Sequence, residues 1–207
     1  MHLPDGIIPI EQSAIYWVIT LVVIAVFLYK FSRNEQKEKA TISIALFAVF
    51  FVVVTSLSIP SPLGVPIHFF LIPLVAILLG PWNGSIVSFF GLLVQAFALN
   101  MGGIVCFGAN FLVIGVIVAF ATYGFYRLLA NVNDKMAIFF ATVVGIMFAT
   151  FGQVLILIVS GAMNLNGLLA TLVPFYLFIS IIEGFANVVI IYAIRNAKPE
   201  ILDLSKM

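Results

Sequence analysis

The first two residues of the chain, Met1 and His2, carry nitrogen groups that can chelate one metal ion. The α-amine of Met1, the backbone nitrogen of His2 and the Nδ1 atom of its imidazole can reach the same ion through small, low-strain chelate rings. Three nitrogens in one plane favour Ni(II) or Cu(II), and Co(II) is also compatible with them. A fourth donor is needed, and the chain offers only one other histidine, His68. The competing interpretation is a second-position histidine without any metal role.

The segment around this dipeptide is typical of a functional N-terminus of a mature protein. Residues 1–6 lack the basic region of a signal peptide and include an acid, Asp5, so we expect Met1 to start the mature chain. We expect Asp5 to order the segment by accepting backbone N–H bonds in an Asx turn.

Composition places the rest of the chain in a lipid bilayer. Of its 207 residues, 64% are hydrophobic and 8% are charged, whereas soluble domains carry about 25% charged residues. The net charge of +1 gives no reason to expect nucleic acid as a partner. The single cysteine excludes an intrachain disulfide and a cysteine-cluster metal site. The phosphate-loop motif of many ATP-binding proteins is also missing.

Apolar runs predict an all-α protein with about seven transmembrane helices. The third run is short and contains Pro73, and short or broken membrane segments often mark binding sites in transporters. We expect a tight turn over Pro81–Gly84. The seven predicted spans cover residues 13–31, 41–59, 67–80, 85–99, 108–129, 136–160 and 168–194.

The basic residues predict the orientation. With seven spans, every lysine and arginine falls on one side of the membrane, in the first polar loop, the fifth-to-sixth loop and the tail. The positive-inside rule assigns that side to the cytoplasm. The N-terminus then lies outside, together with the uncharged breaks at 60–67 and 100–107, and the C-terminus lies in the cytoplasm. This arrangement brings Met1, His2 and His68 to one side.

Four polar residues inside or near the spans are candidates for supporting a metal site. A metal-bound histidine usually donates its other N–H to a polar partner. Asn110 is the stronger candidate for this role and Gln95 a weaker one, and Asn187 is also considered. The alternative for all three is an ordinary hydrogen bond between helices. Glu183 is the only acid inside a predicted span, so it is either functional or a buried structural partner.

Taken together, these residues resemble the CbiM/NikM family, the substrate-capture components of energy-coupling-factor transporters for cobalt and nickel. The resemblance rests on Met1-His2-x-x-Asp5-Gly6, His68, the block from Ala76 to Trp82, Gln95-Ala96, Gly108-Ala109-Asn110 and Glu183-Gly184. It implies a planar metal site made by Met1, His2 and His68. It also implies two kinds of partner: a transmembrane coupling subunit and ATP-hydrolysing subunits. The apolar neighbours of His68 depart from the expected pattern and leave the support of its ring unidentified.

We therefore expect one multi-pass domain of the plasma membrane that captures Ni(II) or Co(II) as a transported substrate and is not an enzyme. Residues 1–12 would form the metal-binding loop, 13–194 the helical bundle and 195–207 a cytoplasmic tail. Two other functions stay open. A membrane-embedded metalloenzyme would need an acid or base, such as Asp5, beside an open coordination position. A vitamin-capture component would have an aromatic-lined site and would tolerate loss of His2 and His68.

Overall fold

The computed structural model describes residues 2–57 and 68–197, and this part of the chain is helical throughout, with no strands. Met1, the predicted break after residue 59 and the tail beyond Ala197 lie outside the described residues. In chain order, the helices are α1 (Ile10–Ser32), α2 (Lys37–Ser56), α3 (Ile72–Leu79), α4 (Pro81–Ala98), α5 (Phe107–Asn110), the π-helical segment η1 (Phe111–Ile117), α6 (Val118–Leu129), α7 (Asp134–Val159) and α8 (Leu165–Ala197).

Within the described residues, five helical stretches are long and apolar enough to cross a membrane: α1, α2, the continuous run 107–129, α7 and α8. Two predicted spans have counterparts that are not among these five. The third corresponds to α3, whose eight residues extend only about 12 Å, and the fourth corresponds to α4 with 18 residues. The predicted all-helical membrane fold is confirmed, and the short third segment is a half-helix.

All eight residues of α3 are buried in the bundle, where its backbone is shielded from lipid. The predicted turn over Pro81–Gly84 is wrong, because α4 begins at Pro81. Proline suits the first helical turn, where its missing N–H has no partner to lose. The chain reverses one residue earlier, at Gly80, whose φ of 82° favours glycine.

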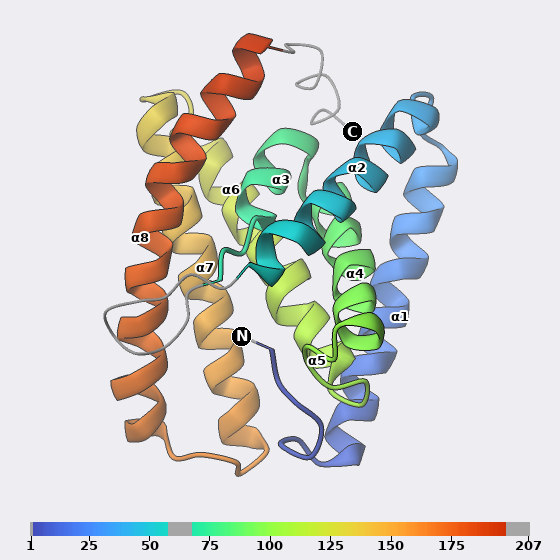
Figure 1. Cartoon of the computed structure of the whole chain (residues 1–207), viewed down its shortest axis with the longest axis vertical. Helices are drawn as coiled ribbons and strands as arrows, with labels where there is room; N and C mark the ends of the chain where they lie inside the picture. Colours follow the sequence, from blue (N-terminus) through green and yellow to red (C-terminus); the bar gives the residue numbers. More distant parts are fainter. Residues whose placement is uncertain (1, 58–67, 198–207) are drawn as a thin grey trace.

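The helices arrange the loops at two ends of the molecule (Figure 1). The α1–α2 loop, the α6–α7 loop and the end of α8 lie at the top, and α3 rises toward them from the middle. The N-terminal segment, the loop before α5 and the α7–α8 loop lie toward the bottom. The top end, here called the basic end, carries all the described lysines and arginines: Lys30, Arg33, Lys37, Lys39, Arg127, Lys135 and Arg195.

Candidate metal-binding site

The N-terminal segment enters the bundle because its backbone is held by one side chain. The N–H of Leu3 donates to Asn110 Oδ1 at 2.7 Å, and Asn110 Nδ2 donates to the Leu3 carbonyl at 3.0 Å. The N–H of Gly103 donates to the same carbonyl at 2.9 Å. Asn110 therefore contacts the backbone beside His2 and fixes where that residue enters the bundle, whereas a metal-supporting role had suggested contact with a histidine ring.

Asp5 secures the segment to the loop that precedes α5. Its carboxylate accepts the N–H of Ile104 at 3.0 Å and the N–H of Cys106 at 3.0 Å. The expected backbone N–H bonds are present, but their donors come from a distant loop, so the expected Asx turn is wrong. Gly103 allows this close approach, since a Cβ at that position would collide with the Asp5 carboxylate.

The His2 ring ends a directional chain of hydrogen bonds. The Thr55 hydroxyl donates to the Phe51 carbonyl at 2.6 Å, and therefore accepts from Gln95 Nε2 at 2.7 Å. This leaves Gln95 Oε1 facing His2 Nε2 at 3.0 Å. An amide oxygen only accepts, so His2 carries its proton on Nε2. The Nδ1 atom of His2 is then unprotonated, and it is the ring nitrogen closer to the backbone.

The same threonine also orients His68. The His68 Nδ1 atom lies 3.1 Å from the Thr55 carbonyl, which can only accept, so Nδ1 carries the proton. In the neutral ring this contact selects the tautomer whose Nε2 atom is unprotonated. This contact is the ring support that the apolar neighbours of His68 did not reveal. Thr55 thus touches both systems, through its hydroxyl toward His2 and its carbonyl toward His68.

Glu183 holds the segment that follows His68. Its two carboxylate oxygens accept the N–H groups of Phe70 at 2.7 Å and Leu71 at 2.9 Å. These donors stand at the start of α3, where backbone N–H groups lack helical partners and a negative charge is favoured. Leu71 has a left-handed backbone with φ of 60°, unusual for a branched residue. The buried carboxylate keeps this conformation in place and so positions His68 indirectly.

Both histidines line one cavity of about 230 Å³. Aromatic side chains form much of its wall, with Ile114 from the π-helical segment, a type of helix often found at functional sites. Burial lowers the pKa of His2 to about 4, so its ring is neutral near pH 7. Among the described residues, no three His, Cys, Asp or Glu side chains gather as a metal cluster. The cavity is thus lined by two imidazole rings, a type of ligand that suits borderline metal ions.

The structure brings most of the predicted site residues together. His2 and His68 line the cavity, while Asp5, Asn110 and Glu183 hold the segments that carry them. Gln95, the weaker candidate, contacts the His2 ring. Thr55 was missed, because a threonine that bonds to the carbonyl four residues earlier is common in helices.

Comparison with known proteins identifies the family to which the whole chain is similar. A model of the family described as "Cobalt uptake substrate-specific transmembrane region" matches residues 2–201. The cobalt transport protein CbiM of Clostridium tetani is 31% identical over 211 residues, covering 97% of this chain and 87% of that protein. The putative fused nickel transport protein NikMN of Archaeoglobus fulgidus is 26% identical over 205 residues, covering 98% of this chain and 68% of that protein.

A crystal structure of a transition metal transporter in truncated form superposes with a TM-score of 0.85. The match is 24% identical and covers 95% of this chain and 99% of the other, which shows the same fold. The matched relatives are named as transport proteins, in agreement with the expectation of a transporter rather than an enzyme. Because the family model spans nearly the whole chain, this multi-pass membrane protein belongs to the CbiM family of cobalt uptake proteins.

Proposed function

We propose that this chain captures Ni(II) or Co(II) at the external face of the plasma membrane and passes it on for ATP-driven import by an energy-coupling-factor transporter. In this proposal four nitrogens hold the metal in a plane: the Met1 amine, the His2 backbone nitrogen, His2 Nδ1 and His68 Nε2. The names of relatives, which include cobalt and nickel transport proteins, support both metals as substrates. The metal is the cargo of the protein.

The observation that carries the proposal is the protonation pattern of the two histidines. The hydrogen bonds of His2 leave Nδ1 unprotonated, and Nδ1 is the atom able to chelate together with its own backbone nitrogen. The hydrogen bond of His68 leaves Nε2 unprotonated, at the far end of the ring from its backbone. Metal-bound histidines are oriented in this manner by the partners of their other ring nitrogen.

The metalloenzyme alternative is less well supported. It needs an acid or base beside the metal, and Asp5 was its candidate. The Asp5 carboxylate instead accepts two backbone N–H groups in the loop before α5. Four planar nitrogens also leave no open in-plane position for a substrate.

The aromatic wall of the cavity would suit a vitamin, but the cavity is smaller than the usual pocket for an organic ligand. Pockets for organic ligands generally occupy about 300–1,000 Å³, and this cavity measures about 230 Å³. A vitamin site would also give no reason for two histidines to present unprotonated nitrogens to the same space.

Orientation and partners complete the proposal. The positive-inside rule assigns the basic end to the cytoplasm, so the N-terminal segment faces outward. The transmembrane coupling subunit and the ATP-hydrolysing subunits would then act on the chain from the cytoplasmic side, in the plasma membrane. A cysteine at Gln36 should react with impermeant label only from the cytoplasm, and labelling from outside intact cells would refute this orientation.

The decisive experiment adds one residue before Met1 and changes nothing else in the chain. Protein with a free Met1 amine, verified by intact mass spectrometry, is titrated with Ni(II) and Co(II) in a calorimeter. One added residue before Met1 converts the amine into an amide and should abolish tight binding. A tag at the C-terminus is the control and should leave affinity unchanged. Equal affinity of the extended and native proteins would show that the Met1–His2 chelate is wrong.

A further inference from the structure

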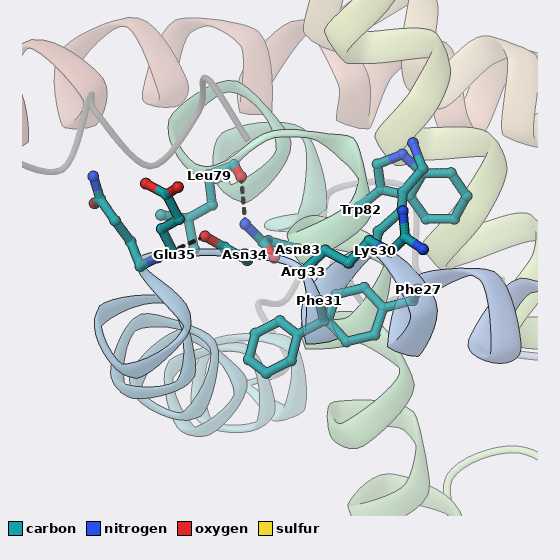
Figure 2. A pocket seen from close by; sticks show the side chains of 10 residues that line it. Phe27, Lys30, Phe31, Arg33, Asn34, Glu35, Leu79, Trp82 and Asn83 are labelled. Carbon is teal, nitrogen blue, oxygen red and sulfur yellow. Dashed lines mark hydrogen bonds between the residues drawn. The ribbon is translucent and has the colours of Figure 1, made fainter.

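A second cavity, of about 630 Å³, lies at the basic end of the molecule, far from the histidines (Figure 2). It is bounded by the end of α1, the α1–α2 loop and the junction between α3 and α4. Phe27, Phe31, Leu79 and Trp82 supply its apolar side. Tryptophan is enriched where hydrocarbon meets headgroups, so this cavity has the composition of a membrane–water boundary.

Two cations line the same cavity without a carboxylate partner. The Lys30 ammonium lies 4.6 Å from the centre of the Trp82 ring, and the Arg33 guanidinium lies 4.5 Å from the Tyr29 ring. Within the described residues, the ion pair found is Arg195–Asp134, elsewhere at this end. Glu35 also lines the cavity, but in Figure 2 its side chain lies apart from those of Lys30 and Arg33. The two cations therefore keep an uncompensated positive charge.

The helices on either side of the cavity present lipid-facing surfaces. On α1, Leu28 and Tyr29 are 57% and 58% exposed, and on α2, Ile42 and Leu46 are 69% and 67% exposed. In a bilayer such apolar side chains contact acyl chains. A lipid beside these helices can therefore place its acyl chains against them, with an apolar part for the aromatic wall and a charged part for the cations.

We propose that this cavity binds one anionic phospholipid, with its phosphate between Lys30 and Arg33 and the start of its acyl chains against Phe27, Phe31 and Trp82. Basic pockets between transmembrane helices bind acidic headgroups by this combination of charge and apolar contact. A bound lipid would contact the end of α1, the α1–α2 loop and the α3–α4 junction, and would stabilise their arrangement at the basic end. This inference is independent of the proposed metal chelate.

The experiment counts bound lipids by native mass spectrometry of the detergent-purified full chain. Phosphatidylglycerol and phosphatidylcholine with identical acyl chains are titrated in parallel, and phosphatidylglycerol should bind selectively with one molecule per chain. Removing both charges with Lys30→Gln and Arg33→Gln should weaken its binding roughly 20- to 30-fold, at about fivefold for each cation.

Two matched variants test location and charge. The pair Lys37→Gln and Lys39→Gln removes the same charge from α2, outside the cavity lining, and should leave binding nearly unchanged. The exchange Lys30→Arg with Arg33→Lys keeps both charges and should retain binding, which would show that positive charge at these positions is what the lipid requires. Thermal unfolding verifies that each variant is folded.

Several results would overturn the proposal. Equal binding of the two lipids would exclude recognition of the anionic headgroup. An equal loss in the α2 pair would mean that surface charge alone attracts the lipid. Displacement of the lipid by inorganic phosphate at equal concentration would identify a soluble anion as the occupant. Displacement by a synthetic peptide of residues 198–207, which contains acidic and apolar residues, would identify the chain's own tail instead.

Discussion

The two ends of the bundle hold their polar groups by different interactions. At the histidine end, Gln95 and Thr55 are neutral and 0% and 3% exposed, and each hydrogen bond fixes the direction of the next. At the basic end, Arg195 donates to Asp134 at 2.6 Å and to the Tyr126 hydroxyl at 2.9 Å. The Arg195 and Asp134 side chains are 17% and 29% exposed.

The two kinds of interaction differ in how tightly they fix the geometry of the side chains. Buried neutral hydrogen bonds are directional and hardly screened by salt, so they can fix one ring orientation for each histidine. Partly exposed ion pairs are weakened by salt and contribute little energy. We therefore expect changes at the histidine end to alter metal affinity, and changes to the Arg195–Asp134 pair at the basic end to alter only stability and salt dependence.

The largest effect is expected for His68→Ala. The substitution removes one of the proposed donors from a half-buried position at the cavity, with little loss of core packing. Changes to outer partners alone cost roughly 10- to 100-fold in metal affinity, so direct loss of a donor should exceed about 100-fold. Calorimetry at matched pH measures this loss, and unchanged affinity would remove His68 from the proposed site.

Gln95→Leu should come next, with a loss of roughly 10- to 100-fold in affinity. Leucine cannot accept from His2 Nε2, so the ring is free to carry its proton on Nδ1. Asn187→Leu is the matched control, since Asn187 is also a buried amide that donates to a threonine hydroxyl, Thr142 at 3.1 Å, but does not line the cavity. It should reduce stability and leave metal affinity unchanged. Equal losses of affinity in the two variants would contradict the proposal that the hydrogen bonds from Thr55 through Gln95 orient the His2 ring.

Glu183→Ala should lower metal affinity about tenfold, a typical effect of losing an outer partner. It leaves the buried N–H groups of Phe70 and Leu71 without an acceptor, at a cost of about 1–3 kcal/mol each. Hydrogen exchange at those two amides should accelerate together with the loss of affinity. Glu183→Gln, which keeps one acceptor oxygen, should be intermediate. Faster exchange without any loss of affinity would limit Glu183 to a structural role.

Docking of the metal-free N-terminal segment should weaken as pH falls from 6.5 toward 4. Burial lowers the pKa of His2 from 6.5 to about 4, so the undocked ring takes up a proton within this window while the docked ring stays neutral. The docking equilibrium should shift by up to about tenfold per pH unit. Hydrogen exchange at the Leu3 amide, corrected for intrinsic pH dependence, reports docking. His2→Asn should abolish the pH effect, and a flat response in the native chain would argue against a buried neutral ring.

The smallest effect is expected for Asp134→Asn at the basic end. Because both partners are partly exposed, loss of the ion pair should cost no more than about 1 kcal/mol of stability. Thermal unfolding at low and high salt should show a difference that disappears at high salt. Metal affinity should be unchanged, and a large loss would mean that the two ends are energetically coupled.

Much of the fold follows from local sequence because hydropathy and helix length are local properties. The apolar runs predicted the membrane helices to within a few residues at most of their ends, and Pro73 correctly indicated a short third segment. The turn at Pro81 was wrong because proline can either end a helix or begin one. Which of the two occurs depends on Gly80 and on the buried position of α3.

The sequence by itself determined the membrane location, the helical class and the presence of a nitrogen-rich dipeptide at the start of the chain. Only the tertiary structure decided which nitrogen of each histidine is unprotonated. The His2 ring meets a partner 93 positions away in the sequence, and the backbone of the next residue, Leu3, is held by one 107 positions away. An imidazole takes the tautomer that its hydrogen-bond partner requires. That partner is chosen by the packing of α2, α4 and α5 around the N-terminal segment, which no local pattern of residues encodes.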